Sequence, residues 1–370
     1  MDGAYSRSDS PMTGSRLWAG ADQPALRALG VARMRVGTEG APVGRREVRA
    51  HPFYILSELT RLDAPPAEPL LIVPPISGQF APLLRDMIVT LLARYRVFVL
   101  DWVNARHVPR TAGSFGFEAN IAAVHAAIRA MGSGGHVVAL CQGGVPALAA
   151  TARLSEAGDP AVPAALALIA APVDAMANPT GLVRLLRDRP ISWYRTVPLW
   201  PVSHRYAGAG RMVYPAWMQL AAVNSYIGRR ATGDAEIARK MRHDDGTDPG
   251  HFPFLDLCTS VMDIDGENYV ENIARVFHER ALARGRLLFE GAPVRPDAMS
   301  GTALMTVEGE VDDIAAPGQT AAAHALCPAL PARRRGRLVV ADCGHFSLFH
   351  GARWRDEIAP ALIDFVRNAA

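Results

Sequence analysis

The sequence predicts an α/β fold in which a mostly parallel sheet is flanked by helices and interrupted by a mainly helical insertion. Short apolar runs alternate with stretches of helical periodicity between residues 70 and 170. This alternation stops over residues 173–295, which are rich in Pro, Trp, Tyr and Arg, and it returns from residue 303 to the end. Short strands that alternate with helices of about 10 to 15 residues are typical of βαβ units and a parallel sheet. A sheet that is interrupted and then completed indicates a core with a cap.

Each expected strand is a short apolar run, and the first of them ends at the pair Pro74-Pro75. The expected strands cover residues 70–73, 97–100, 136–140, 164–170, 303–307 and 338–341. The expected helices cover residues 80–94, 117–131, 145–154, 319–326 and 354–367. We therefore divide the chain into an N-terminal arm over 1–45, a core formed by 46–172 and 296–370, and a cap insertion over 173–295. The arm is expected to be loose because it is rich in Gly, Ser, Ala and Arg and has no clean period.

Composition and charge exclude several classes of protein. Hydrophobic residues make up 49% of the chain, which rules out global disorder. The 39 basic and 36 acidic residues give a net charge of +3, which is too balanced for a protein organised around nucleic acid. No apolar run reaches the ~18 residues that a membrane span needs, and no secretory signal is visible at the start. The four cysteines follow neither a zinc pattern nor a disulfide framework, so we expect a cytoplasmic protein without a bound metal.

The segment ALCQGG, residues 139–144, carries the strongest chemical signal. A strand ends, the reactive residue Cys141 follows, and glycines open the next helix. This is the shape of a nucleophile elbow, whose tight turn requires small residues such as Ala139 and Gly143 beside the nucleophile. The positive end of the helix dipole favours a thiolate at this place. A lone cysteine is more often a buried core residue, but the strand–Cys–x–Gly–Gly context favours a nucleophile.

An elbow nucleophile needs an acid and a histidine later in the chain, in that order. After the cap, an expected strand ends in the segment EGEVDD, which contains the adjacent residues Asp312 and Asp313. Either carboxylate can orient an imidazole, and the other is then a loop or helix-capping residue. His345 follows another expected strand on a Gly turn and is favoured as the base. His324 lies within an expected helix, and His350 is a weaker rival.

The site also needs hydrogen-bond donors for the oxyanion that forms during acyl transfer. In an elbow one donor is the backbone N–H of the residue after the nucleophile, which is Gln142 here. The second comes from the loop after an earlier strand, and residues 74–79 occupy that place. Because prolines have no N–H, Ile76 or Ser77 would supply it. Ser77 is a poor rival nucleophile because it lacks the following x-Gly.

Four stretches of the chain resemble intracellular polyhydroxyalkanoate (polyhydroxybutyrate) depolymerases, over roughly residues 50 to 368. They are residues 101–106 (DWVNAR), 208–215 (GAGRMVYP), 303–324, and Gly344-His345 followed by 351–355 (GARWR). The resemblance implies an α/β-hydrolase fold and a Cys–His–Asp triad.

On the matching positions, the resemblance implies that Cys141, Asp312 and His345 form this triad. The spacing from Asp312 to His345 agrees with the family pattern and favours Asp312 over Asp313.

The resemblance further implies a carboxylic ester hydrolase, of the EC 3.1.1 class, that cleaves poly(3-hydroxyalkanoate) through a thioester acyl-enzyme and needs no cofactor. The family commonly has Pro where this chain has Gly143, and Cys-Gln-Gly-Gly is closer to the polyhydroxyalkanoate synthases. The alternatives are therefore a synthase-like acyltransferase that uses hydroxyacyl-CoA, or a catalytically inactive granule-surface protein. The partner that we expect is the polymer or the surface of a polyhydroxyalkanoate granule in the cell.

Aromatic residues are concentrated in residues 193–217, where six occur although the average content of 7% predicts about two. This segment either forms the cap's own core or presents an apolar surface to a greasy substrate, and both interpretations stay open. A polymer cannot diffuse into a site, so an apolar surface beside the active-site mouth is expected. Trp193, Trp200 and Trp217 are the candidates.

Overall fold

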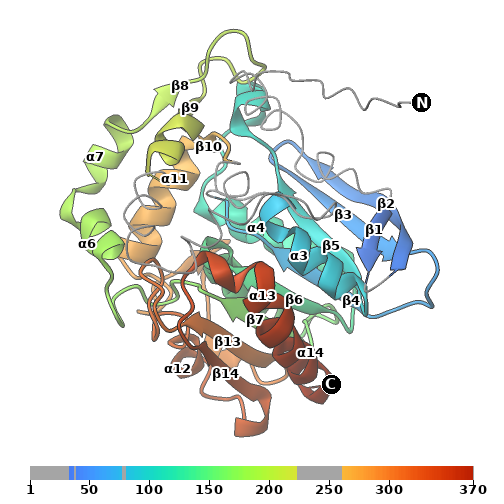
Figure 1. The fold of residues 1–370 in the computed structure, drawn as a ribbon. Helices are drawn as coiled ribbons and strands as arrows, with labels where there is room; N and C mark the ends of the chain where they lie inside the picture. Colours follow the sequence, from blue (N-terminus) through green and yellow to red (C-terminus); the bar gives the residue numbers. More distant parts are fainter. Residues whose placement is uncertain (1–32, 37–38, 77–80, 223–260, 370) are drawn as a thin grey trace, which may run out of the picture.

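The computed structural model describes residues 33–36, 39–76, 81–222 and 261–369, and its centre is a nine-stranded sheet (Figure 1). The strand order is β1-β2-β3-β5-β4-β6-β7-β13-β14. The strands from β5 to β14 in this order are parallel, whereas β1, β2 and β3 form an antiparallel edge that joins β5. The expected α/β fold class is confirmed. The bounds of the strands are β1 (Arg33–Val36), β2 (Glu39–His51), β3 (Tyr54–Arg61), β4 (Pro69–Val73), β5 (Arg96–Trp102), β6 (His136–Leu140), β7 (Ala165–Ile169), β13 (Ala303–Gly309) and β14 (Arg335–Val340).

The inner parallel strands β4, β6, β7 and β13 are buried along their whole length, because helices cover the sheet. In the part of the chain that the structure describes, α4 and α5 pack against each other, and α3 contacts α14 and the π-helical turn η8. Both α3 and α14 lie in front of the sheet in Figure 1. The helices of the core are α3 (Ala81–Leu92), α4 (Phe117–Met131), α5 (Gly144–Glu156), α12 (Ala323–Leu326), α13 (Gly351–Arg353) and α14 (Ala359–Ala369), and η8 covers Trp354–Ile358.

The expectation of a loose arm over residues 1–45 is wrong for the part that the structure describes, where β1 forms and β2 begins. The physical reason is that buried and exposed residues alternate along β2, a pattern that its arginines obscure in the sequence. Ala41 and Val43 are buried against the sheet, while the side chain of Arg46 lies in solvent and pairs with Glu58 on β3. Residues 1–32 lie outside the described residues.

The segment between β7 and β13 forms the cap, in which helices are joined by a small three-stranded sheet of order β10-β9-β8. These elements gather beside one end of the central sheet, away from β1 and β2 (Figure 1). The helical content agrees with the expected cap, and the small sheet was not expected. The described elements are α6 (Gly181–Asp188), α7 (Ile191–Thr196), β8 (Trp200–Pro201), β9 (Met212–Tyr214), β10 (Ile264–Asp265), α11 (Gly266–Asn272), the π-helical η4 (Ile273–His278), β11 (Leu288–Phe289) and β12 (Ala292–Pro293).

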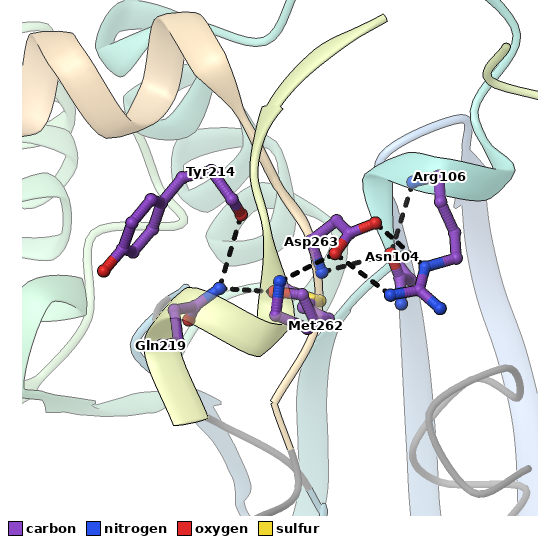
Figure 2. Close-up of polar contacts among 7 residues, drawn as sticks. Asn104, Arg106, Tyr214, Gln219, Met262 and Asp263 are labelled. Carbon is purple, nitrogen blue, oxygen red and sulfur yellow. Dashed lines mark hydrogen bonds and ion pairs between the residues drawn. The ribbon is translucent and has the colours of Figure 1, made fainter. Parts of the chain in front are cut away.

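A buried ion pair fixes the cap to the loop that follows β5 (Figure 2). Arg106 donates two hydrogen bonds to the carboxylate of Asp263, at 2.9 and 3.0 Å, and both residues are buried. Asn104 Oδ1 accepts hydrogen bonds from the backbone N–H groups of Arg106 and Asp263. A buried pair of this kind is tolerated because its two-point geometry and its neighbours satisfy the charges.

A second buried arginine strengthens the same junction from the cap side. Arg211 donates hydrogen bonds to the carbonyl oxygens of Val108, Pro109 and Gly113, which all belong to the core. Its charge is balanced by Asp265 at 2.7 Å. The segments 101–106 and 208–215, which carry part of the family resemblance, therefore meet where cap and core join.

No helix among the described residues is long and apolar enough to cross a membrane.

Candidate active site

Cys141 lies on a strained turn between β6 and α5. Its φ of 47° places it in the left-handed region, which non-glycine residues rarely adopt. A reactive residue held in this conformation, after a buried strand and before a helix, is the geometry of a nucleophile elbow. Strain of this kind costs about 1–3 kcal/mol and persists only where the surrounding structure enforces it.

The two glycines after Cys141 explain how the turn can be so tight. A Cβ atom on Gly143 would lie 2.8 Å from the Val73 carbonyl oxygen, and one on Gly144 would lie 2.3 Å from the Ala171 Cβ. The elbow is thus pressed between the ends of β4 and β7, and larger residues would push it out of place. This explains in physical terms why the segment needs small residues there.

His345 and Asp312 form a buried pair at the ends of neighbouring strands. Asp312 follows β13 and His345 follows β14, and the His345 Nδ1 to Asp312 Oδ2 distance is 2.7 Å. The other carboxylate oxygen of Asp312 accepts hydrogen bonds from the backbone N–H groups of Ile314 and Ala315, at 2.8 and 2.9 Å. These bonds fix the carboxylate, so that it can hold the imidazole in one orientation. The side chain of the neighbouring Asp313 is exposed.

The imidazole of His345 also meets Cys141. Burial alone would lower the pKa of His345, but the negative charges of Asp312 and Cys141, and hydrogen bonds to both side chains, raise this pKa well above its usual value. An imidazolium is therefore favoured beside the sulfur. The structure thus brings the three residues together, with His345 bound to both Asp312 and Cys141.

Cys141 opens into a pocket of about 190 Å³ that is shared by core and cap. Most of its lining is apolar, with a few polar side chains, which is the usual composition of a small-molecule site. From the core the lining residues are Ile76, Cys141, Gln142, Pro172, Ile314 and Ala315, and from the cap they are Leu182, Leu186, Tyr214, Ile264, Asn268, Tyr269, Asn272, Ile273 and Phe277.

The structure describes two of the three residues expected to form the oxyanion hole. Gln142 and Ile76 both line the pocket beside Cys141. Ser77 lies outside the described residues. The close approach of Gly143 to Val73 and Pro74 brings the start of this loop against the elbow, as a two-part oxyanion hole requires.

The rival histidines do not join this arrangement. His324 is buried on α12, with Nε2 at 3.0 Å from Thr306 Oγ1 and 3.1 Å from the Gly336 carbonyl oxygen. Burial, and then the charge of Arg337, lower the pKa of His324 to about 4, so this imidazole is neutral in the core. His350 is buried, and Asp312 is paired with His345 instead.

The three tryptophans predicted for substrate binding do not line the pocket. Trp193 is partly buried and packs edge-on against Tyr194, with ring centroids 5.0 Å apart. Trp200 and Trp217 are 51% and 49% exposed, and their rings contact each other at 5.9 Å. Sequence reasoning thus found one partly buried tryptophan and one exposed pair.

Sequence reasoning missed the cap residues that reach the pocket, among them Tyr269, Asn268 and Asn272 on α11. Tyr269 stacks on Tyr214 with ring centroids 4.0 Å apart, and burial raises the pKa of both phenols. The signal available was the N-Y-x-x-N spacing of residues 268–272, which places both asparagines on one side of a helix. Nothing in the sequence showed that this side faces Cys141.

Comparison with known proteins identifies both a family and a fold. Residues 170–370, more than half of the chain, match the family described as the C-terminus of PHB (polyhydroxybutyrate) depolymerases. No curated protein matches the chain significantly.

Two solved structures illustrate the similarity in fold. A monoacylglycerol lipase from Paleococcus ferrophilus is 12% identical with a TM-score of 0.50, and the match covers 86% of this chain and 99% of that one. A candidate aryl esterase from Burkholderia cenocepacia is 15% identical with a TM-score of 0.52, over 88% of this chain and 99% of that one. These likenesses show the α/β-hydrolase fold.

Proposed function

Because the chain belongs to the PHB depolymerase family and is thus a carboxylic ester hydrolase, we propose that it cleaves poly(3-hydroxyalkanoate), in particular polyhydroxybutyrate, with a Cys141–His345–Asp312 triad. The observation that carries this proposal is the strained Cys141 in contact with a His345 that Asp312 orients. A structural cysteine needs neither the strain nor the buried imidazole–carboxylate pair.

The first half of the reaction forms a thioester. The Cys141 thiolate attacks the ester carbonyl carbon, and a C–S bond forms as the carbonyl becomes a tetrahedral oxyanion. The oxyanion then collapses, the C–O bond to the leaving chain breaks, and the His345 imidazolium gives its proton to the departing alcohol. The raised pKa of His345 suits this step because it keeps the proton available at neutral pH.

The second half of the reaction uses water. Neutral His345 takes a proton from a water molecule, whose oxygen attacks the thioester carbonyl. The C–S bond breaks, the sulfur leaves as a thiolate, and the acid product departs. Asp312 holds the ring so that Nε2 faces the reacting atoms in both halves, because Nδ1 is engaged by the carboxylate.

The oxyanion is held by backbone N–H groups. The N–H of Gln142 is one donor, and the loop at Ile76 and Ser77 supplies the second. Gln142 and Ile76 support this assignment because both line the pocket with Cys141.

The polymer is the cell's own, and the enzyme works in the cytoplasm on the surface of the granule. The exposed pair of Trp200 and Trp217, together with Met212, which is 45% exposed on the neighbouring strand, gives the cap an apolar surface. We call these three residues the tryptophan patch. An exposed apolar patch on a chain that must act at a polymer surface supports docking there.

The decisive experiment is an assay of the purified protein on amorphous polyhydroxybutyrate granules, with and without CoA. Release of 3-hydroxybutyrate or its oligomers without CoA is expected. Cys141→Ala should abolish this release while leaving the fold intact, and Cys141→Ser should retain little or none, because a site built for a thiolate activates a hydroxyl poorly.

Three outcomes would count against the proposal. Full activity of Cys141→Ala would remove the nucleophile assignment. Formation of hydroxybutyryl-CoA only, and only with CoA, would favour an acyltransferase. Granule binding without any acyl transfer would favour an inactive surface protein.

A further inference from the structure

Two buried asparagines of the cap line the catalytic pocket and have unused hydrogen-bonding capacity. Asn268 and Asn272 lie four residues apart on α11 and both line the pocket with Cys141. Asn268 is 0% exposed and Asn272 is 4% exposed. Asn268 Oδ1 and Asn272 Nδ2 make no hydrogen bond to any residue that the structure describes. Most buried polar atoms in folded proteins have a partner, so two unpartnered atoms on residues that line one pocket point to a ligand in that pocket.

The amide of Asn268 cannot turn to exchange its acceptor for a donor. Its Nδ2 donates to the Gly116 carbonyl oxygen at 3.2 Å, before the start of α4. Next to it, Glu271 accepts a hydrogen bond from the backbone N–H of Phe117 at 2.6 Å, which holds α11 against the same turn. The unpartnered atom of Asn268 is thus fixed as an acceptor, Oδ1, and the unpartnered atom of Asn272 is a donor, Nδ2.

A poly(3-hydroxyalkanoate) chain offers partners of both kinds only at one end. Every unit has an ester carbonyl, which accepts hydrogen bonds and fits Asn272 Nδ2. Interior units have no O–H or N–H group, so they cannot satisfy an acceptor. The free hydroxyl at one end of the chain is the donor that Asn268 Oδ1 lacks.

We propose that the pocket recognises the hydroxyl end of the polyester, with the terminal hydroxyl donating to Asn268 Oδ1 and an ester carbonyl accepting from Asn272 Nδ2. This inference rests on the proposed function and deepens it. The acyl group transferred to Cys141 is then the hydroxyl-terminal portion of the chain. Cleavage proceeds from that end and releases short hydroxyacids, and scission in the middle of a chain is disfavoured.

The test compares two soluble substrates that differ in one atom group. One is a linear trimer of 3-hydroxybutyrate with a free hydroxyl end, and the other is the same trimer with that hydroxyl acetylated. The capped trimer leaves Asn268 Oδ1 unpaired, so kcat/KM of the wild type should be about 10- to 100-fold higher for the free trimer. This comparison uses the unaltered protein and depends on no variant's folding.

Variants then assign the preference to its residue. Asn268→Leu, or the smaller Asn268→Ala, should bring the free-over-capped ratio close to one. Asn272→Leu should lower kcat/KM for both trimers and keep the ratio, because both contain the carbonyl. The matched control is Asn120→Leu, since Asn120 is 2% exposed and also has an unpartnered Oδ1 among the described residues but does not line the pocket. It should keep the wild-type ratio, and circular dichroism checks each fold.

The outcomes separate this inference from the function on which it rests. Equal cleavage of both trimers by the wild type would overturn the hydroxyl-end recognition and leave the depolymerase proposal standing. Cleavage of neither trimer, with another short ester cleaved, would overturn both. An unchanged ratio in a folded Asn268 variant would remove the assignment to this residue.

Discussion

At the scale of single residues, the choice between the two adjacent aspartates is the sharpest test of the triad. Asp312→Asn keeps an acceptor for the N–H groups of Ile314 and Ala315 but turns an amide toward His345 Nδ1, which favours the wrong tautomer. The loss in kcat can reach about 10⁴-fold. Asp313→Asn, at an exposed side chain, should change kcat little.

The titration of His345 gives a second readout of the same change. In the wild type the imidazole should keep its proton well above pH 6.5 and lose it as the pH rises through its raised pKa. In Asp312→Asn the negative charge beside the imidazole is lost. Less then opposes the lowering effect of burial, so the pKa of His345 should fall. Proton NMR of the ring measures both. If Asp313→Asn were inactive and Asp312→Asn were as active as the wild type, the acid of the triad would be Asp313 and not Asp312.

A different histidine should control stability in acid. The unfolded chain protonates His324 near pH 6.5, whereas the folded state resists until about pH 4. The stability contributed by neutral His324 is therefore complete above pH 6.5 and is lost as the pH falls to about 4, by about 3 kcal/mol. Urea unfolding of His324→Gln should show a smaller loss over this range. Parallel pH profiles of variant and wild type would exclude His324 as the cause.

The placement of individual site residues could be predicted from the sequence where chain order fixes it. Cys141, Asp312 and His345 each follow a strand of the parallel sheet, and the ends of parallel strands meet at one edge of a sheet. The placement of Asn268 and Asn272 could not be predicted. It depends on how α11 docks on the turn at Gly116, which is a contact between segments about 150 residues apart.

At the scale of elements, the core strands and helices were predictable because apolar runs mark the buried strands of a parallel sheet. The antiparallel edge was missed, because in β2 the arginines mask the alternation of Ala41 and Val43. The expected helix over residues 319–326 is only four residues long, as the backbone before it turns to bind Glu308 through three N–H groups. Tertiary hydrogen bonds outweighed helical propensity there.

The element that holds the cap is open to a direct test. Arg106→Met should lower the free energy of unfolding by about 3–5 kcal/mol, because it leaves the buried Asp263 carboxylate without its cation. Adding Asp263→Asn should restore part of the loss, since an amide is easier to bury than a charge. Urea unfolding of the two variants measures this. Equal stability of Arg106→Met and wild type would show that the pair does not hold the cap.

At the scale of the whole molecule, granule binding and ester hydrolysis should be separable. Trp200 and Trp217 are exposed and lie outside the pocket lining, so Trp217→Ala should weaken binding to polyhydroxybutyrate granules and spare hydrolysis of a short soluble ester. Trp193→Ala is the contrasting variant, because its ring packs on Tyr194, and it should lower thermal stability instead. If granule binding and hydrolysis of the short ester fell together in a folded Trp217→Ala protein, the docking role of the tryptophan patch would be refuted.

The clamp between Arg106 and Asp263 has a consequence for how substrate preference could diversify. The proposed catalytic residues all lie in the core, whereas Asn268, Asn272 and Tyr269 of the cap line the pocket into which Cys141 opens. The cap residues Arg211 and Glu271 hydrogen-bond to backbone groups of the core, whereas Asp263 binds a core side chain, that of Arg106. Selectivity is thus modular, and this ion pair is a contact that depends on a particular side chain on each side. A chimera that receives residues 173–295 of a relative should therefore acquire the donor's preference, provided that the graft keeps a carboxylate at position 263.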